Sequence, residues 1–248
     1  MVFDFLKREV RDVRMILDVL TCWVVLIFNF GALGKIVKPY ARHFSETDAS
    51  LALPHTGTEI VDDWRLITVI LLAPLLVFFA FQCRRRSFID VKVAFLSVSQ
   101  GITVASMFAR YMKLSGRLRP DFLERLATGN EHLVLDGRTS FPSEHTTYAF
   151  SSMVAVFWYL VGKLHVFESR YTSFPVALVV LTPLGVAAGI GVSRTLDHLH
   201  HFSDIVAGAC IGSFSGSFAY FLNFPSPFHC ECHLSKREID PESSKKKR

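Results

Sequence analysis

Six long apolar stretches limit the folds open to this 248-residue chain more than any other feature. They cover residues 16–37, 66–82, 93–109, 146–162, 173–193 and 205–224. Because an α-helix rises about 1.5 Å per residue, each stretch can cross about 30 Å of hydrocarbon. Half of the residues are hydrophobic and 20% are charged, which is too apolar for an ordinary soluble domain. We therefore predict an all-α polytopic membrane protein with a bundle of six transmembrane helices.

The same stretches divide the chain into three parts. We expect residues 1–14 to form a cytoplasmic N-terminal segment, residues 15–224 the membrane domain, and residues 225–248 a basic cytoplasmic tail. With both termini in the cytoplasm, more than half of the 27 Lys and Arg residues lie on the cytoplasmic side, as the positive-inside rule requires. Lys245 and Lys246, at the fourth and third positions from the end, resemble a retrieval signal of the endoplasmic reticulum, but attraction of a basic tail to anionic lipid is a simpler explanation. Location in the endoplasmic reticulum or the plasma membrane is left open, and no nucleic-acid partner is expected.

The predicted topology brings four polar segments to one face of the membrane. Counting six spans from a cytoplasmic N-terminus places residues 113–120, 142–145, 193–194 and 200–204 on the luminal or extracellular face. These segments are far apart in the sequence, and random placement would scatter them over both faces. We therefore expect them to converge at one depth and to form a site.

Two histidines in these segments suit nucleophilic and acid–base chemistry. His200 and Asp204 are four positions apart, so a helix that begins near His200 places both on one face. A carboxylate at one ring nitrogen fixes the imidazole tautomer and leaves the other nitrogen free to attack. His145, at the start of another span, is suited to protonate a leaving alcohol.

Basic residues near these histidines suit a phosphate group. Arginine offers a planar fork of donors that matches phosphate oxygens, and lysine adds a point charge; the candidates are Lys113, Arg119 and Arg194. Ser143 is a candidate N-cap of the fourth span, and the first backbone amides of a helix bind anions. Contact with lipid headgroups is the alternative interpretation of any one of these cations alone.

A metal site is a competing interpretation of the last polar segment. Metal-ligating side chains crowd it: Asp197, His198, His200, His201 and Asp204. Further ligands that would clearly complete such a site are missing elsewhere in the sequence. We therefore expect neither a metal nor another cofactor.

These segments resemble the signature of the type 2 phosphatidic acid phosphatase superfamily, the lipid phosphate phosphatases. That signature reads Lys-x6-Arg-Pro, then Pro-Ser-Gly-His, then Ser-Arg-x5-His-x3-Asp. The third motif is met in full from Ser193 to Asp204, the second appears as Pro142-Ser143-Glu144-His145, and the first lies between Lys113 and Pro120. The resemblance covers roughly residues 60–233, and residues 51–56, 162–165 and 231–233 are most similar to the phospholipid phosphatase 4/5 branch, which includes diacylglycerol pyrophosphate phosphatase-like proteins.

The resemblance implies a six-helix fold of the phosphatase and haloperoxidase-like class. It implies a magnesium-independent hydrolase of lipid phosphomonoesters or diphosphates such as phosphatidic acid and diacylglycerol pyrophosphate. His200 is then the nucleophile that forms a phosphohistidine, Asp204 orients it, and His145 protonates the leaving group and later activates water. The groups implied to hold the phosphate are Lys113, Arg119, Ser143, Arg194 and the backbone of Glu144.

Two departures from the signature concern the phosphate site. Five residues rather than six separate Lys113 from Arg119, and a slip of one helical position turns a side chain by about 100°. Glu144 replaces the glycine, and a carboxylate there repels a phosphate dianion unless it turns outward. We expect a weakened phosphatase whose turnover rises in the variant Glu144→Gly. The alternative is a catalytically silent protein that binds lipid phosphate.

Small residues recur at helical spacing in the last two spans. Gly208, Gly212 and Gly216 are four apart, as are Gly185 and Gly189. Such stripes allow helices to approach closely, either within one bundle or in a homodimer. We expect packing within the bundle and keep the homodimer as the alternative.

Overall fold

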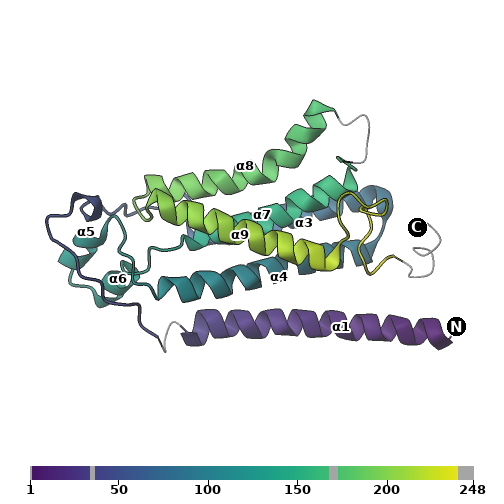
Figure 1. Ribbon diagram of the computed structural model, residues 1–248, viewed down its shortest axis with the longest axis horizontal. Coiled ribbons are helices and arrows are strands. Elements are labelled where there is room, and N and C mark those ends of the chain that lie inside the picture. The colour runs from purple at the N-terminus through teal and green to yellow at the C-terminus, as the bar shows by residue number, and fades with distance from the viewer. Residues whose placement is uncertain (1, 34–36, 168–172, 240–248) are drawn as a thin grey trace.

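The computed structural model describes residues 2–33, 37–167 and 173–239. Six long helices lie side by side along the long axis of the molecule (Figure 1). Their bounds are α1 Val2–Ile27, α3 Asp63–Arg85, α4 Phe88–Lys113, α7 Glu144–Lys163, α8 Phe174–Leu196 and α9 Phe202–Asn223. The side chains of residues 2–12, 32–33 and 84–85 lie outside the described part. The prediction for Lys245 and Lys246 falls outside the described residues.

Four shorter helical elements join the long helices. The π-helix η1 (Phe28–Leu33) continues α1, and the 3-10 turn η2 (Ala49–Leu51) lies in the loop before α3. The short helices α5 (Phe122–Ala127) and α6 (Glu131–Asp136) lie between α4 and α7. Figure 1 places α5 and α6 at the end of the bundle where α4 and α8 end and where α7 and α9 begin.

The prediction of an all-α membrane protein with a six-helix bundle is confirmed, and the described residues form no strand. In the described part of the chain, five helices are long and apolar enough to cross a membrane, and α7 is not among them. This central helix packs against α3, α4, α8 and α9 and fully buries Thr146, Thr147, Ser151 and Ser152. The Thr147 hydroxyl donates to the carbonyl oxygen of Ser143, and that of Ser152 donates to the carbonyl oxygen of Ile70 in α3, so protein groups around the helix satisfy them.

Helix α1 forms the edge of the bundle (Figure 1) and packs mainly against α4. The side-chain amide of Asn29, in η1, donates to the hydroxyl of Ser106 in α4 at 3.0 Å. The helix begins at Val2 and continues without a break past residue 14. Residues 2–14 of the predicted N-terminal segment are thus helical and continuous with the first span, and the division of the chain into three parts stays a prediction.

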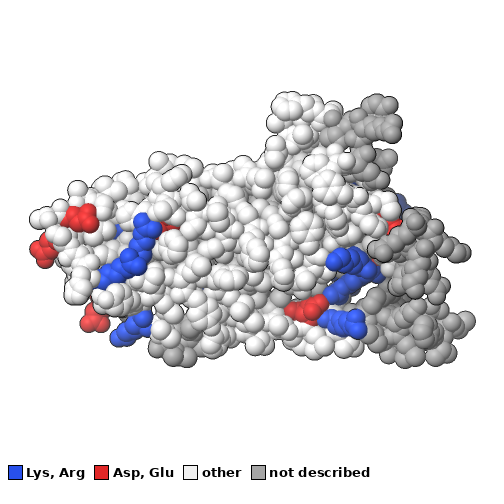
Figure 2. All heavy atoms as spheres, viewed as in Figure 1, with Lys and Arg blue, Asp and Glu red and all other residues white. Residues whose placement is uncertain are grey.

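The surface of the bundle has the charge pattern of a membrane protein. On the face shown in Figure 2, Lys, Arg, Asp and Glu gather towards the two ends, and a band without them lies between. Large apolar side chains are exposed on the outer helices, among them Trp23, Leu76 and Phe214. Such a band is what a surface in contact with lipid hydrocarbon requires.

Helices α7 and α9 are in very close contact through the glycine stripe of α9. A methyl group added to Gly212 would lie 2.3 Å from the carbonyl oxygen of Thr147, and one added to Gly216 would lie 2.3 Å from that of Ser151. These obstacles are backbone atoms and cannot move aside cheaply, so this approach depends on glycine. The prediction that this stripe packs within the bundle is confirmed.

The second glycine stripe is open. A methyl group added to Gly185 or Gly189 of α8 would meet no heavy atom within 4 Å in the described part of the chain. A homodimer stays a prediction, because this stripe alone does not show what covers it.

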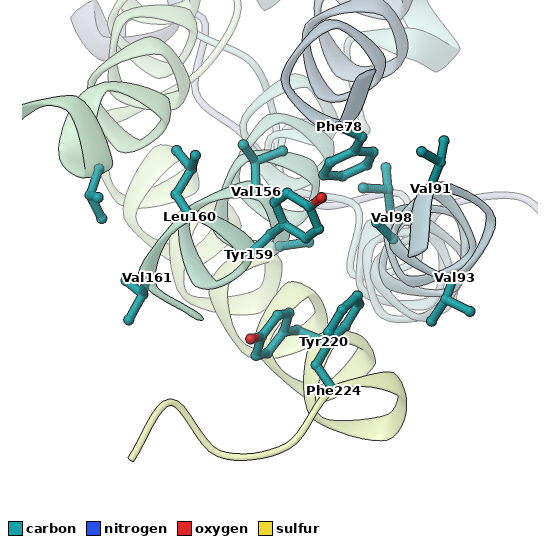
Figure 3. Packing of buried hydrophobic residues seen from close by; sticks show 13 residues of the cluster. Phe78, Val91, Val93, Val98, Val156, Tyr159, Leu160, Val161, Tyr220 and Phe224 are labelled. Carbon is teal, nitrogen blue, oxygen red and sulfur yellow. The ribbon is translucent and has the colours of Figure 1, made fainter. Parts of the chain in front are cut away.

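Apolar and aromatic side chains fill the bundle at the end away from α5 and α6. In Figure 3, Tyr159 of α7 lies among residues of α3, α4 and α9. Its ring meets Phe78 edge to face at 4.6 Å and Phe224 at 5.9 Å between centroids. Its hydroxyl donates to Asp90 at 2.7 Å, and the same buried carboxylate pairs with Lys163 at 2.5 Å. Buried charges in a membrane bundle need such partners, so this pair ties α4 to α7.

We predict that Gly212→Ala separates α7 from α9 and destabilises the protein, because the new methyl group meets the Thr147 backbone. The matched control is Gly189→Ala, another glycine inside a helix, where the space is open. Alanine is favoured over glycine in a helix by about 1 kcal/mol, so the control should be neutral or stabilising. Thermal unfolding in detergent measures both variants, and equal melting temperatures would contradict the close contact.

Candidate active site

The four predicted segments meet at the end of the bundle that carries α5 and α6. Lys113 ends α4, Ser143 caps α7, Arg194 lies in the last turn of α8, and His200 precedes α9. Each of these four residues is less than a tenth exposed. The backbone amide of Ser143 donates to the carbonyl oxygen of Asp204 at 3.2 Å, which joins the starts of α7 and α9 directly.

The imidazole of His200 is held by the loop before α7. Its Nδ1 lies 2.7 Å from the carbonyl oxygen of Ser140, which can only accept, so Nδ1 carries the proton. Nε2 then keeps its lone pair, as a nucleophilic imidazole requires. Burial, reinforced by the charges of Arg119 and Lys113 and opposed by Asp204, lowers the pKa of His200 to about 3. The ring is therefore neutral at physiological pH.

Asp204 does not contact His200 in the way that the helical spacing predicts. Helix α9 begins at Phe202 with His201 as its N-cap, so His200 lies outside the helix. The Oδ2 atom of Asp204 accepts hydrogen bonds from the amide of His201 at 3.0 Å and from the hydroxyl of Ser140 at 2.6 Å. It lies 3.8 Å from Nδ1 of His200, which is too long for a hydrogen bond. Ser140 therefore links the two, its hydroxyl to the carboxylate and its carbonyl to the ring.

The start of α7 presents groups suited to an anion. Ser143 is the N-cap, as predicted, and its hydroxyl accepts from the amide of Thr146. The amides of Glu144 and His145 are then first-turn groups without partners in the helix. Nε2 of His145 is buried and makes no hydrogen bond within the described residues, and it lies 3.5 Å from a carboxylate oxygen of Asp63. A buried ring nitrogen of this kind has its hydrogen-bonding capacity available to a ligand atom.

Both arginines of the signature segments, Arg119 and Arg194, form ion pairs with carboxylates. Arg194 reaches Glu59 with Nη1 and Asp197 with Nη2, both at 2.7 Å. Arg119 donates to the carboxylate of Asp136 at 2.9 Å. Burial alone would raise the pKa of Asp136, but the facing arginines and Lys113 outweigh it and hold that pKa below its ordinary value. Any anion that binds Arg119 or Arg194 must compete with these carboxylates.

Lys113 reaches the site although the signature spacing is one residue short. Helix α4 ends at Lys113, and Gly116 in the following loop has a φ of 67°, in the left-handed region that favours glycine. The loop, rather than a helical turn, therefore sets where Arg119 lies relative to Lys113. The Nζ atom of Lys113 donates to the carbonyl oxygen of Thr139 at 2.6 Å, next to Ser140 and the His200 ring.

The loop before α3 lies across the same end of the bundle. The amide of Leu53 donates to the carbonyl oxygen of Pro120 at 3.0 Å. The hydroxyl of Thr56 donates to the carbonyl oxygen of Asp197 at 2.7 Å, and the amide of Ile60 donates to its carboxylate at 3.0 Å. These bonds hold Glu59, in the same loop, against Arg194.

The geometry gives the competing metal interpretation no support. His198 bonds through Nδ1 to the carbonyl oxygen of Pro54 at 3.0 Å, and His201 bonds through Nε2 to that of Leu118 at 3.1 Å. Within the described ranges, no three His, Cys, Asp or Glu side chains are grouped closely enough to hold a metal ion.

Comparison with known proteins identifies the family. The sequence profile of the PAP2 superfamily matches residues 91–226, which is more than half of the chain. The chain belongs to the PAP2 superfamily. The matched region runs from α4 to the residues just after α9 and includes both histidines of the site and all three signature segments.

Several PAP2 relatives match most of the chain. A PA-phosphatase related-family protein of Dictyostelium discoideum is 37% identical over 243 residues, covering 96% of this chain and 88% of the relative. Lipid phosphate phosphatase 2 of Arabidopsis thaliana is 30% identical and covers 83% and 77%. Diacylglycerol pyrophosphate phosphatase 1 of Saccharomyces cerevisiae is 28% identical and covers 84% and 79%. No solved structure matches the chain significantly.

The groups that hold the predicted site residues in place were not predicted from the sequence of this PAP2 protein. Ser140 lies in the loop between α6 and α7, and nothing in the sequence of that loop predicts its hydrogen bonds to His200 and Asp204. Glu59 lies in the loop before α3 and pairs with Arg194 of α8. Asp136 ends α6 and pairs with Arg119 in the loop between α4 and α5. No sequence spacing marks such pairs.

The buried, neutral state of His200 predicts a pH-dependent stability for this PAP2 protein. The pKa is about 3 in the folded protein and about 6.5 when unfolded, so the unfolded state binds the proton first as pH falls. Stability from this group is present above pH 6.5 and is lost as the pH falls towards 3. The variant His200→Gln should therefore lose less stability than the wild type between pH 7 and pH 5, by roughly 2 kcal/mol. Unfolding in detergent at the two pH values measures this, and equal losses would show that His200 is not buried as described.

The contact of Glu59 with Arg194 predicts competition between this carboxylate and a bound anion. The variant Glu59→Gln should bind orthophosphate several-fold more tightly, because Arg194 loses one of its two carboxylate partners. The rise of the melting temperature with added orthophosphate measures this affinity. Glu46→Gln changes an exposed carboxylate of the same loop and serves as the control. An unchanged affinity in Glu59→Gln would mean that Glu59 does not occupy the anion site.

Proposed function

We propose that this PAP2 protein is a membrane lipid phosphate phosphatase that works through a phosphohistidine and without magnesium. The substrates we propose are phosphatidic acid, diacylglycerol pyrophosphate or related lipid phosphates. The observation that carries the proposal is the position of His200. Its neutral ring keeps the Nε2 lone pair and is buried at the same end of the bundle as two arginines, a lysine and the start of α7.

In the first step, Nε2 of His200 attacks the phosphorus atom. A nitrogen–phosphorus bond forms as the bond from phosphorus to the lipid oxygen breaks, and the electron pair leaves with that oxygen. His145 gives its proton to the leaving oxygen, which departs as the lipid alcohol or, for a pyrophosphate, as the shorter lipid phosphate. A phosphate dianion beside His145 favours the protonated imidazole that this role requires.

In the second step, water hydrolyses the phosphohistidine. His145, now neutral, accepts a proton from the attacking water as the oxygen–phosphorus bond forms and the nitrogen–phosphorus bond breaks. The electron pair returns to Nε2 of His200, and inorganic phosphate leaves. The carbonyl of Ser140 keeps the proton on Nδ1 throughout, so the ring does not need to change tautomer.

The cations and the start of α7 stabilise the charge on the transferring group. We assign Lys113, Arg119 and Arg194 to the equatorial phosphoryl oxygens, together with Ser143 and the backbone amide of Glu144. Asp204 acts from a distance: it anchors the Ser140 hydroxyl and pairs with Arg117 at 2.7 Å. It is a positioning residue in this scheme rather than a direct partner of His200.

The orientation in the membrane belongs to the same proposal. We place both termini in the cytoplasm and the active site on the luminal or extracellular side, in the endoplasmic reticulum or the plasma membrane. The excess of Lys and Arg in the segments at the end opposite the site supports this orientation. The substrate headgroup then comes from the leaflet next to α5 and α6.

A lipid-phosphate binder without catalysis is the second candidate. It is favoured by the carboxylates that already occupy Arg119 and Arg194 and by Glu144 in the second motif. Such a protein binds phosphatidic acid but releases no phosphate from it.

Phosphate release in the presence of a chelator separates these candidates. We predict that the purified protein in detergent releases phosphate from phosphatidic acid with EDTA present, and that His200→Ala lowers the rate at least about a thousandfold, because the nucleophile is lost. The mutant protein should still bind phosphatidic acid micelles.

Three other results contradict the proposal in different ways. Equal phosphate release by wild type and His200→Ala removes His200 as the nucleophile. Binding without any release supports the silent binder. Activity that requires an added divalent metal supports the metal interpretation.

A further inference from the structure

Glu144 stands where the family signature has glycine, and its side chain is turned towards α4. The Oε1 atom of its carboxylate forms an ion pair with Nε of Arg110 at 2.8 Å. The hydroxyl of Tyr148, one turn further along α7, lies 3.3 Å from the same oxygen. The carboxylate that was expected to repel the phosphate is thus held on the flank of the site.

Arg110 is itself held in place on its other side. Its guanidinium lies over the ring of Phe30 in η1, 4.3 Å from the centroid, and Phe30 lies 6.1 Å from the ring of Tyr148. Side chains of three elements, η1, α4 and α7, are therefore in contact around the Arg110–Glu144 pair. The side chains of this pair are about three-quarters or more buried, so solvent screens their attraction less than at an open surface.

The nearest alternative partner for Glu144 is a lysine of the phosphate site. Arg110 and Lys113 are three positions apart on α4, so they lie on the same face of the helix. Oε2 of Glu144 is 3.9 Å from Nζ of Lys113, at the outer limit of an ion pair. If Arg110 loses its charge, the carboxylate gains most by moving closer to Lys113. That movement neutralises a cation of the phosphate site and brings negative charge towards the bound dianion.

We propose that Arg110 is a positioning residue that holds the Glu144 carboxylate away from the phosphate and keeps Lys113 available to it. The proposal rests on the proposed phosphatase function, and it assigns Arg110 a role that none of the three signature segments contains. It also explains how a glutamate is compatible with this position, since a cation on the neighbouring helix compensates for it. Arg110 acts through Glu144 and does not itself touch the substrate.

The test compares four full-length variants in detergent: Arg110→Gln, Arg110→Lys, Arg110→Gln/Glu144→Gln and the control Lys92→Gln, which removes an exposed cation at the opposite end of α4. Two readouts are measured, KM for phosphatidic acid and the affinity for orthovanadate from the rise in melting temperature. We expect Arg110→Gln to weaken both about tenfold, because Glu144 shifts towards Lys113. Arg110→Lys and the double variant should recover both to within about twofold of the wild type, and the control should match it.

Each outcome decides the proposal. A double variant as impaired as Arg110→Gln, or an unchanged orthovanadate affinity in Arg110→Gln, overturns the positioning role and leaves Arg110 as a packing residue. If the wild type turns over no faster than His200→Ala while orthovanadate affinity follows the expected order, the phosphatase proposal fails and the role of Arg110 in anion binding stands. If the wild type binds no orthovanadate, both proposals fail.

Discussion

The contact between α7 and α9 is the constraint on which the rest of the structure depends. Backbone carbonyls of α7 lie where any side chain at Gly212 or Gly216 would be, so the two helices have one close register available. At the site end, the same contact continues as the hydrogen bond from Ser143 to the carbonyl of Asp204. Because α7 begins beside His145 and α9 begins just after His200, the contact fixes the two histidines relative to each other. Apolar burial does not select this register in a bilayer, since lipid is as apolar as the protein core.

Electrostatic balance is the second constraint, because the site gathers cations at the edge of a low-dielectric slab. Arg119 and Arg194 have carboxylate partners, and Lys113 has a carbonyl and a distant carboxylate. These partners hold the cationic side chains in place. The site is therefore preorganised for an anion that offers more acceptor oxygens than the present partners do. In the proposed function these carboxylates also oppose binding of the substrate phosphate, so we expect its affinity to depend on how far Glu59 and Glu144 are drawn away. The Arg110–Glu144 pair draws one carboxylate away from the site, whereas the loop that carries Glu59 holds another against Arg194.

The sequence predicted the helices and the gathering of the site residues at one end of the bundle, because both follow from where apolar runs begin and end. Counting spans was enough to bring His145 and His200 to one end of the bundle. The sequence did not predict contacts that depend on where a helix begins or on which residue of a neighbouring helix lies opposite. The spacing of His200 and Asp204 suggested a shared helical face, but the helix begins two residues after His200, and the Asp204 carboxylate accepts instead from the amide of the N-cap residue His201. The carboxylate of Glu144 was expected to face the phosphate or solvent, and its partner on α4 became visible only from the packing of α4 against α7.

Trapping the phosphorylated protein is the sharpest test of whether the α7–α9 contact places a neutral, nucleophilic His200 beside the substrate phosphate. The wild-type protein is mixed with phosphatidic acid labelled in its phosphate, quenched rapidly in alkali and digested, and the labelled peptide is sequenced by mass spectrometry. We expect the label on His200 alone, stable in alkali and lost in acid. Label on any other residue, or turnover without a labelled intermediate under the same quench, would contradict it.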